Sequence, residues 1–206
     1  MRKILTPKER LTEIIDTSYR ILCNKIVSQS IRIPNEASFQ LQFGVILKQI
    51  GQLYEFEESD RFSIQLEDVQ TINITQKSKN GKARCDIMLS LRSNEVDYSV
   101  AIELKHFKKA DGETITDNRF SILCDIENLE NYKKTNTKLV ECFEILYTDN
   151  PNYTNPQSTS YIKIGEGVKL NTGIHSSNRR SVQLEKSYIF KWDTYENNHC
   201  FLKIKV

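Results

Sequence analysis

Three charged residues near the ends of two predicted strands are the side chains of this chain best suited to chemistry: Asp86, Glu103 and Lys105. Apolar runs on both sides of the turn-forming segment 92–95 are typical of a β-hairpin. A turn centred on the last two residues of that segment places Asp86 opposite Glu103, with Cβ atoms about 4.5–5.5 Å apart. Because side chains alternate along a strand, Glu103 and Lys105 share one face.

Two carboxylates that face each other across a strand pair repel, and partial burial increases the cost. A divalent cation relieves it, since Mg²⁺ takes one or two carboxylates together with water and phosphate oxygens. The lysine then holds an attacking water or balances the charge of a phosphate. The pattern therefore favours a metal site for phosphate chemistry. The alternative is an ordinary amphipathic hairpin whose charged end is solvated.

These three residues resemble the motif of the PD-(D/E)xK nuclease superfamily, which includes many restriction endonucleases. Cys85 stands where the motif has its name-giving proline, a position that varies in the superfamily. Glu103-Leu104-Lys105 is the only Asp/Glu-x-Lys triplet in the sequence, and it follows an apolar strand. The resemblance covers roughly residues 34–148. It implies a restriction endonuclease-like core, with a central mixed sheet flanked by helices.

The resemblance also implies a role for each residue. Asp86, Glu103 and the carbonyl of Leu104 are expected to bind Mg²⁺, for which Mn²⁺ can substitute. Lys105 is expected to orient or help deprotonate the attacking water. Glu36, in the first turn of a predicted helix, is expected to complete the metal shell, because superfamily members often carry a glutamate there. A favourable interaction with the helix dipole is the alternative explanation for Glu36.

The implied activity is Mg²⁺-dependent hydrolysis of phosphodiester bonds in double-stranded DNA, leaving 3′-hydroxyl and 5′-phosphate ends. The compact chain resembles a small type II restriction endonuclease, and such enzymes are usually homodimers. Two alternatives stay open. One is an RNase, such as a tRNA-cleaving toxin, with the same carboxylate core. The other is a non-catalytic domain that binds nucleic acid or protein. The sequence carries no RNA-recognition signature, which favours DNA.

The net charge of +2 does not by itself indicate a nucleic-acid-binding protein. Local basic groups are more informative, because two of them flank the predicted hairpin and a third lies in a polar segment near the C-terminus. Arginine and asparagine read base edges, and lysine contacts phosphates. Solvated surface is the alternative for each group. The candidate DNA-contacting residues are Lys82, Arg84, Lys108, Lys109, Asn178, Arg179 and Arg180.

The elements that must position these residues follow from periodicity and capping signals. Thr6, Pro7 and Glu9 predict a helix start, and Gly51 is expected to cap the end of a second helix. A strand, a helix and another strand after the hairpin predict a parallel crossover and a mixed α/β sheet. We expect one domain over residues 1–206, with an N-terminal helix at 6–28, helices from 35 and at 117–134, a strand at 139–147, and C-terminal strands with a basic loop over 161–206.

The composition is that of an ordinary globular chain, with 206 residues, 38% hydrophobic and 27% charged. No apolar run approaches the roughly 20 residues of a membrane span, and the N-terminus lacks the apolar segment of a signal peptide. A cytoplasmic protein is therefore expected. The five cysteines are odd in number and scattered, which favours buried thiols over disulfides or zinc ligands.

Overall fold

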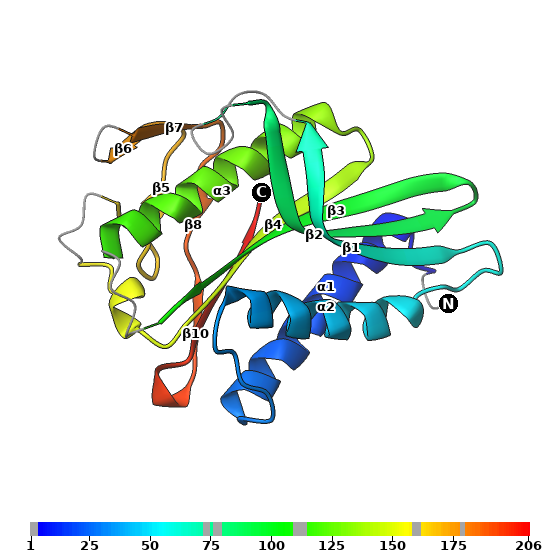
Figure 1. The fold of residues 1–206 in the computed structure, drawn as a ribbon, viewed down its shortest axis with the longest axis horizontal. Coiled ribbons are helices and arrows are strands. Elements are labelled where there is room, and N and C mark those ends of the chain that lie inside the picture. The colour runs from blue at the N-terminus through cyan, green and yellow to red at the C-terminus, as the bar shows by residue number, and fades with distance from the viewer. Residues whose placement is uncertain (1–3, 72–74, 76–79, 109–114, 158–161, 178–179) are drawn as a thin grey trace.

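The computed structural model describes residues 4–71, 75, 80–108, 115–157, 162–177 and 180–206. Within these ranges the chain is an α/β fold with three α-helices and a mixed six-stranded sheet (Figure 1). The strand order is β1-β2-β3-β4-β10-β9, in which only β3 and β4 are parallel. The strands are β1 (Arg61–Thr71), β2 (Lys82–Ser93), β3 (Val96–Phe107), β4 (Leu139–Thr148), β9 (Trp192–Thr194) and β10 (Cys200–Lys205). The predicted mixed sheet and parallel crossover are confirmed.

The first two helices begin where the capping signals predict. The backbone N–H of Thr6 donates to the Glu9 carboxylate at 2.8 Å, and the N–H of Glu9 donates to the Thr6 hydroxyl at 3.3 Å. This is a capping box. The side chain of Asn35 accepts the N–H of Ser38 at 2.8 Å at the start of the second helix. The helices are α1 (Pro7–Val27), α2 (Glu36–Gln52) and α3 (Ile115–Thr135).

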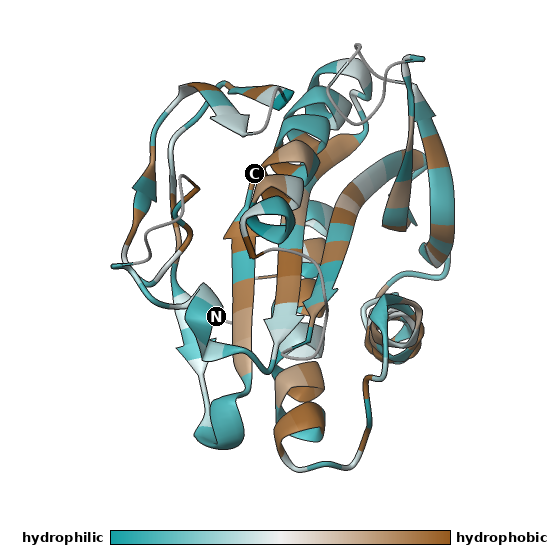
Figure 2. Cartoon of the chain, turned by 60° about the vertical axis from the view of Figure 1, so that its left-hand side comes forward, coloured by the Kyte–Doolittle hydropathy of each residue, from teal (hydrophilic) through white to brown (hydrophobic). Residues whose placement is uncertain are grey.

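The sheet separates two hydrophobic cores. Helices α1 and α2 pack on one face, where Ile102 and Leu104 are fully buried, and α3 packs on the other, with Ala101. Figure 2 shows hydrophobic segments concentrated in the central strands and in the helices that cover them. Because side chains alternate along β3, Glu103 and Lys105 point to the α3 face.

The hairpin between β2 and β3 has the predicted register. Ile87 pairs with Ile102, and Ser93 pairs with Val96. The two turn residues, Asn94 and Glu95, have φ angles of 50° and 65°. Positive φ at both central residues is the signature of a type I′ turn, whose twist matches that of the flanking strands. The turn therefore fixes which β2 and β3 residues face each other at the far end of the hairpin.

Gly51 does not have the predicted role as a helix cap. It lies inside α2, and the cap position is taken by Leu53. A Cβ atom added to Gly51 would lie 2.1 Å from Cε1 of Phe62, at the start of β1. Glycine is needed here because the helix backbone packs directly against that aromatic ring.

The C-terminal region is more ordered than the sequence predicts. We expected C-terminal strands with a basic loop over 161–206, and the part from 165 to 180, which we expected to be the loop, instead contains β5 and β6, with β6 paired with β7. We expected residues 188–192 to pair with the last strand; Trp192 does so, whereas Tyr188 pairs with β5. Leu170, Val182 and Leu184 are buried in the core that contains α3, which explains why the segment is ordered. The strands are β5 (Lys169–Leu170), β6 (Gly173–Ser177), β7 (Arg180–Leu184) and β8 (Tyr188–Ile189).

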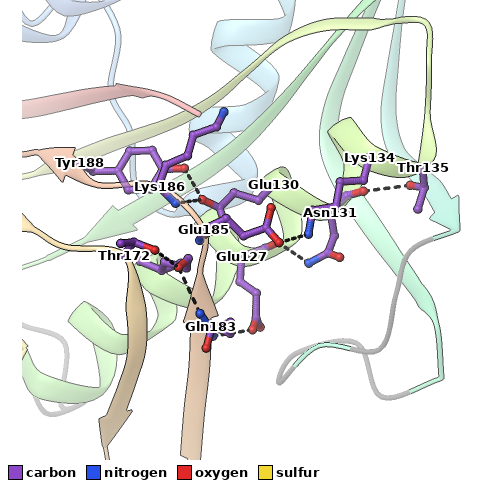
Figure 3. Close-up of polar contacts among 11 residues, drawn as sticks. Glu127, Glu130, Asn131, Lys134, Thr135, Thr172, Gln183, Glu185, Lys186 and Tyr188 are labelled. Atoms are coloured by element: carbon purple, nitrogen blue, oxygen red, sulfur yellow. Dashed lines mark hydrogen bonds and ion pairs between the residues drawn. The ribbon is translucent and has the colours of Figure 1, made fainter.

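Two carboxylates of α3 hold this C-terminal segment in place (Figure 3). Glu127 accepts the backbone N–H of Gln183 at 2.8 Å. Glu130 accepts the N–H of Glu185 at 2.9 Å and of Lys186 at 3.0 Å, and also the hydroxyl of Tyr188 at 2.7 Å. Backbone donors therefore compensate these acidic side chains, and their role is structural.

All five cysteines are buried, as expected. Burial raises the pKa of Cys23 to about 12 and that of Cys142 to about 12, so both thiols are uncharged at neutral pH. None of the helices in the described ranges has the length and apolarity needed to cross a membrane.

Candidate active site

The candidate site lies where β2 and β3 separate. Their pairing ends at Ile87 and Ile102, one pair before the position where Asp86 would face Glu103. Instead, the carboxylate of Asp86 accepts the backbone N–H of Leu104 at 2.7 Å. The Asp86 side chain thus takes the place of the missing strand partner of β3. It contacts the backbone of the Glu103-Leu104-Lys105 triplet.

Asp86 carries an unfavourable charge. Burial raises the pKa of Asp86 above its ordinary value, and the carboxylates of Asp125 and Glu36 raise it further. The ammonium of Lys105 and the Leu104 N–H act in the opposite direction but do not cancel the increase. Burial therefore disfavours the charged form of Asp86 more than the ammonium of Lys105 and the Leu104 N–H stabilise it.

Lys105 is the cation at the centre of this cluster, and only 9% of its surface is exposed. Its Nζ lies 2.9 Å from Oδ2 of Asp125 and 3.7 Å from Oε1 of Glu36, and it donates to the carbonyl of Leu104 at 3.0 Å. Burial opposes the charge of Lys105, but the carboxylates around it outweigh burial and raise its pKa well above the ordinary value. Lys105 is therefore protonated at neutral pH.

Glu103 lies deeper, with 1% of its surface exposed. Its Oε1 accepts the hydroxyl of Tyr132 from α3 at 2.8 Å. Glu103 also faces Glu144 across the parallel pair of β3 and β4, and both carboxylates contribute to the raised pKa of Lys105. As predicted, Glu103 and Lys105 share one face of β3.

Glu36 reaches the same cluster from the other side of the sheet. It is the first residue of α2, and its side chain is 47% exposed. Besides its approach to Lys105, it accepts the N–H of His106 at 3.4 Å. One turn later, Gln40 donates to the backbone carbonyl of Asp86 at 2.7 Å, which ties α2 to β2. The helix thus brings the third predicted carboxylate to the site.

Three residues of the cluster were not expected from the sequence: Asp125, Tyr132 and Glu144. Asp125 and Tyr132 are both buried on α3. Their spacing from the apolar positions Ile122 and Leu129 places a carboxylate on the buried side of that helix, which is a signal that the sequence did contain. Glu144 is a fully buried acid inside the apolar strand β4, and its electrostatic effect on Lys105 depends on the register of β3 and β4.

The donor set suits Mg²⁺, which binds carboxylate and carbonyl oxygens. The unfavourable burial of the Asp86 charge is a second argument, because a bound cation would relieve it. Among the described residues, no group of three or more acidic, histidine or cysteine side chains is arranged to hold a metal ion. Mg²⁺ sites commonly use only one or two carboxylates and complete their shell with water and phosphate oxygens.

The predicted DNA-contacting residues differ in their surroundings. Lys82 and Arg84 are exposed on β2, and Lys108 lines a hollow beside the site. Arg180 forms an ion pair with Asp117, and its guanidinium lies 4.8 Å from the centre of the Phe120 ring. The remaining three residues, Lys109, Asn178 and Arg179, lie outside the described residues.

Comparison with known proteins gives no assignment: no family model, curated protein or solved structure matches this chain significantly.

Proposed function

We propose that this chain is a metal-dependent nuclease that hydrolyses phosphodiester bonds in DNA at the site formed by Asp86, Glu103, Lys105 and Glu36. One observation carries the proposal. A buried, protonated lysine lies where two strands separate, and it contacts carboxylates from α2 and α3. An ordinary hairpin end would leave such charges in water, where they cost little. Burying so many acidic groups around one cation is expensive. Ionisable groups that are perturbed in this way cluster at functional sites.

The carboxylates of Asp86, Glu103 and Glu36 and the carbonyl of Leu104 are the groups that would hold Mg²⁺. When bound, Mg²⁺ would polarise the scissile phosphate and stabilise the charge that develops on the leaving oxygen. Attack by water then breaks the bond from phosphorus to the 3′ oxygen, which takes up a proton and leaves a 3′-hydroxyl and a 5′-phosphate.

The role of Lys105 follows from its charge. A lysine whose pKa is raised well above the ordinary value is a poor proton acceptor at neutral pH. Of its two expected roles, orienting the attacking water or the phosphate is therefore favoured over deprotonating the water. Asp125 holds the ammonium in position through the 2.9 Å contact. It acts through Lys105 and is a positioning residue.

The resemblance to the PD-(D/E)xK superfamily makes the proposal more specific. A restriction endonuclease-like core fits the mixed sheet and the hairpin site, and the resemblance alone implies a homodimer that cleaves a short DNA sequence. An RNase with the same carboxylates, or a domain that binds without cleaving, is an alternative outcome of the following experiment.

Supercoiled plasmid and tRNA should be incubated in parallel with the protein in Mg²⁺, in Mn²⁺ and in EDTA. We expect plasmid cleavage in both metals and none in EDTA, with discrete fragments whose ends can be sequenced. Selective loss of tRNA would indicate the RNase, and inertness toward both substrates would contradict the proposal. Lys105→Met should lose this cleavage, and Lys203→Met is its matched control. Lys203 is also paired with an aspartate, Asp16, but lies on the α1 side of the sheet.

A further inference from the structure

A second feature lies beside the carboxylate cluster. A hollow of about 370 Å³ is formed by the end of α1, the segment 29–34, Lys108, Tyr147 and His199. It shares no residue with the cluster, but two of its lining residues are close along the chain to residues of the cluster. Lys108 follows Lys105 by three residues, about 10 Å along an extended chain, and residue 34 precedes Glu36 by two. The two features meet at the start of α2, where Glu36 approaches Lys105 and accepts the N–H of His106, whose ring stacks on Tyr147 in the wall of the hollow.

The wall of the hollow combines positive charge with apolar surface. Arg32, Lys108 and His199 contribute basic groups, and no carboxylate is among the described residues that line it. Three isoleucines and a proline supply the apolar part: Ile26, Ile31, Ile33 and Pro34. This contrasts with the neighbouring cluster, where acidic groups outnumber the single lysine. The hollow suits a ligand with an anionic group attached to an apolar, flat body.

A stack of aromatic rings supports this wall. The ring of Tyr147 stacks on that of His106 with centroids 5.0 Å apart and planes within 3°, and on that of Phe201 at 4.9 Å. Its hydroxyl makes a 2.9 Å hydrogen bond with Nδ1 of His199. Burial, with contributions from Asp149 and Cys200, raises the pKa of Tyr147 to about 12, so the phenol is uncharged at neutral pH. The wall is thus preorganised, which lowers the cost of binding.

We propose that this hollow binds one nucleotide of the substrate strand, with its phosphate at Arg32 and Lys108 and its base against the isoleucines and the Tyr147–His199 pair. Pockets for small molecules have volumes of about 300–1,000 Å³ and apolar walls with a few charged groups, and this hollow fits that description. Basic groups that track the backbone, beside a surface that takes the base, are the usual arrangement in single-strand binding. The placement on a substrate strand rests on the proposed nuclease function.

The binding step can be tested without cleavage. AMP, adenosine and inorganic phosphate should be titrated calorimetrically into the protein in EDTA. We expect AMP to bind at least about tenfold more tightly than either fragment, because only AMP reaches both parts of the wall. Arg32→Ala should weaken AMP binding about tenfold, the scale of losing a hydrogen bond to a charged group. Arg92→Ala is the matched control, since Arg92 is exposed at the other end of β2.

Adding a single-stranded oligonucleotide to the AMP complex tests whether the hollow binds a nucleotide that is part of a strand. Displacement of AMP supports binding of a strand, and failure to displace it overturns the placement on the substrate. Equal affinity for AMP and phosphate would overturn nucleotide recognition, as would the absence of AMP binding at millimolar concentration or equal weakening by Arg92→Ala. If the protein binds AMP but leaves plasmid intact with Mg²⁺, the pocket stands and the nuclease proposal fails.

Discussion

Each end of the β2–β3 hairpin contains a buried carboxylate beside a basic residue, but the balance of charge differs. At the turn end, Asp60 accepts hydrogen bonds from Arg10 and from the N–H groups of Phe56 and Glu57. Burial alone would raise the pKa of Asp60, yet these donors, together with Ser93, hold it well below the ordinary value. At the open end, several carboxylates surround one lysine.

The difference indicates what each end is for. One anion matched by one cation and by backbone donors is a structural device, and it joins α1 to the start of β1. At the open end four carboxylates raise the pKa of one buried lysine, and burying that many charges together is costly, a cost that a bound cation would lower. The open end is therefore the candidate for cation binding and chemistry. Glu127 and Glu130 of α3 resemble the turn end, since backbone N–H groups compensate both.

The largest expected effect is on stability at the turn end. Asp60→Ala should lower the free energy of unfolding by about 3–5 kcal/mol, because it leaves Arg10 buried without its partner. Urea unfolding measures the loss. Cleavage per folded molecule should stay unchanged, since Asp60 has no contact with the candidate site. A loss below about 1 kcal/mol would show that the pair of Asp60 and Arg10 does not stabilise the fold, contrary to the structural role given to the turn end.

The next effect is on catalysis at the open end. Glu103→Gln should reduce cleavage by at least about 100-fold, the scale of losing a key transition-state contact. The amide oxygen of glutamine can still accept the Tyr132 hydroxyl, so the fold should persist. Lys105→Met should reduce cleavage to a similar extent, but it also costs stability because Asp125 loses its cation. Near-normal activity of Glu103→Gln in a plasmid assay would show that the site is misassigned.

A smaller effect tests the charge excess directly. Mg²⁺ at ten times its dissociation constant should raise the free energy of unfolding by about 1.4 kcal/mol, because it binds only the folded chain. Urea unfolding with and without Mg²⁺ measures the increase. Asp86→Asn should abolish it, whereas Asp60→Asn should retain it. An equal response of both variants would mean that the ion binds elsewhere.

The smallest effect is a difference in pH dependence. The pKa of Asp60 is lowered by folding, so its contribution to stability is complete above about pH 4 and is lost as the pH falls further. The pKa of Asp86 is raised by folding. Its charge therefore opposes folding at neutral pH, and protonation relieves the cost as the pH falls toward its unfolded value. Relative to wild type, Asp86→Asn should be stabilised at pH 7, and this gain should shrink toward pH 4. Unfolding measured across this range checks both signs.

Part of the site could be predicted from local sequence. The turn at Asn94-Glu95 sets the register, and the alternation of β3 puts Glu103 and Lys105 on one face. The Asn35 cap fixes where α2 begins, and hence where Glu36 lies. Asp125 was missed because a lone acid on an apolar helix face does not reveal its partner. Gly51 was misinterpreted because its need for space comes from Phe62, on another element.

The sequence by itself determined the hairpin, the helix starts and the parallel crossover, because turn geometry, capping and side-chain alternation act between residues that are close along the chain. Only the tertiary structure decided how many charges meet at Lys105. Asp125 reaches it from α3, Glu144 from the neighbouring parallel strand and Glu36 from the opposite side of the sheet. The balance between burial and the neighbouring charges and donors then sets the direction of each pKa shift. Both the count of charges and the loss of water depend on packing between distant segments, which no local pattern encodes.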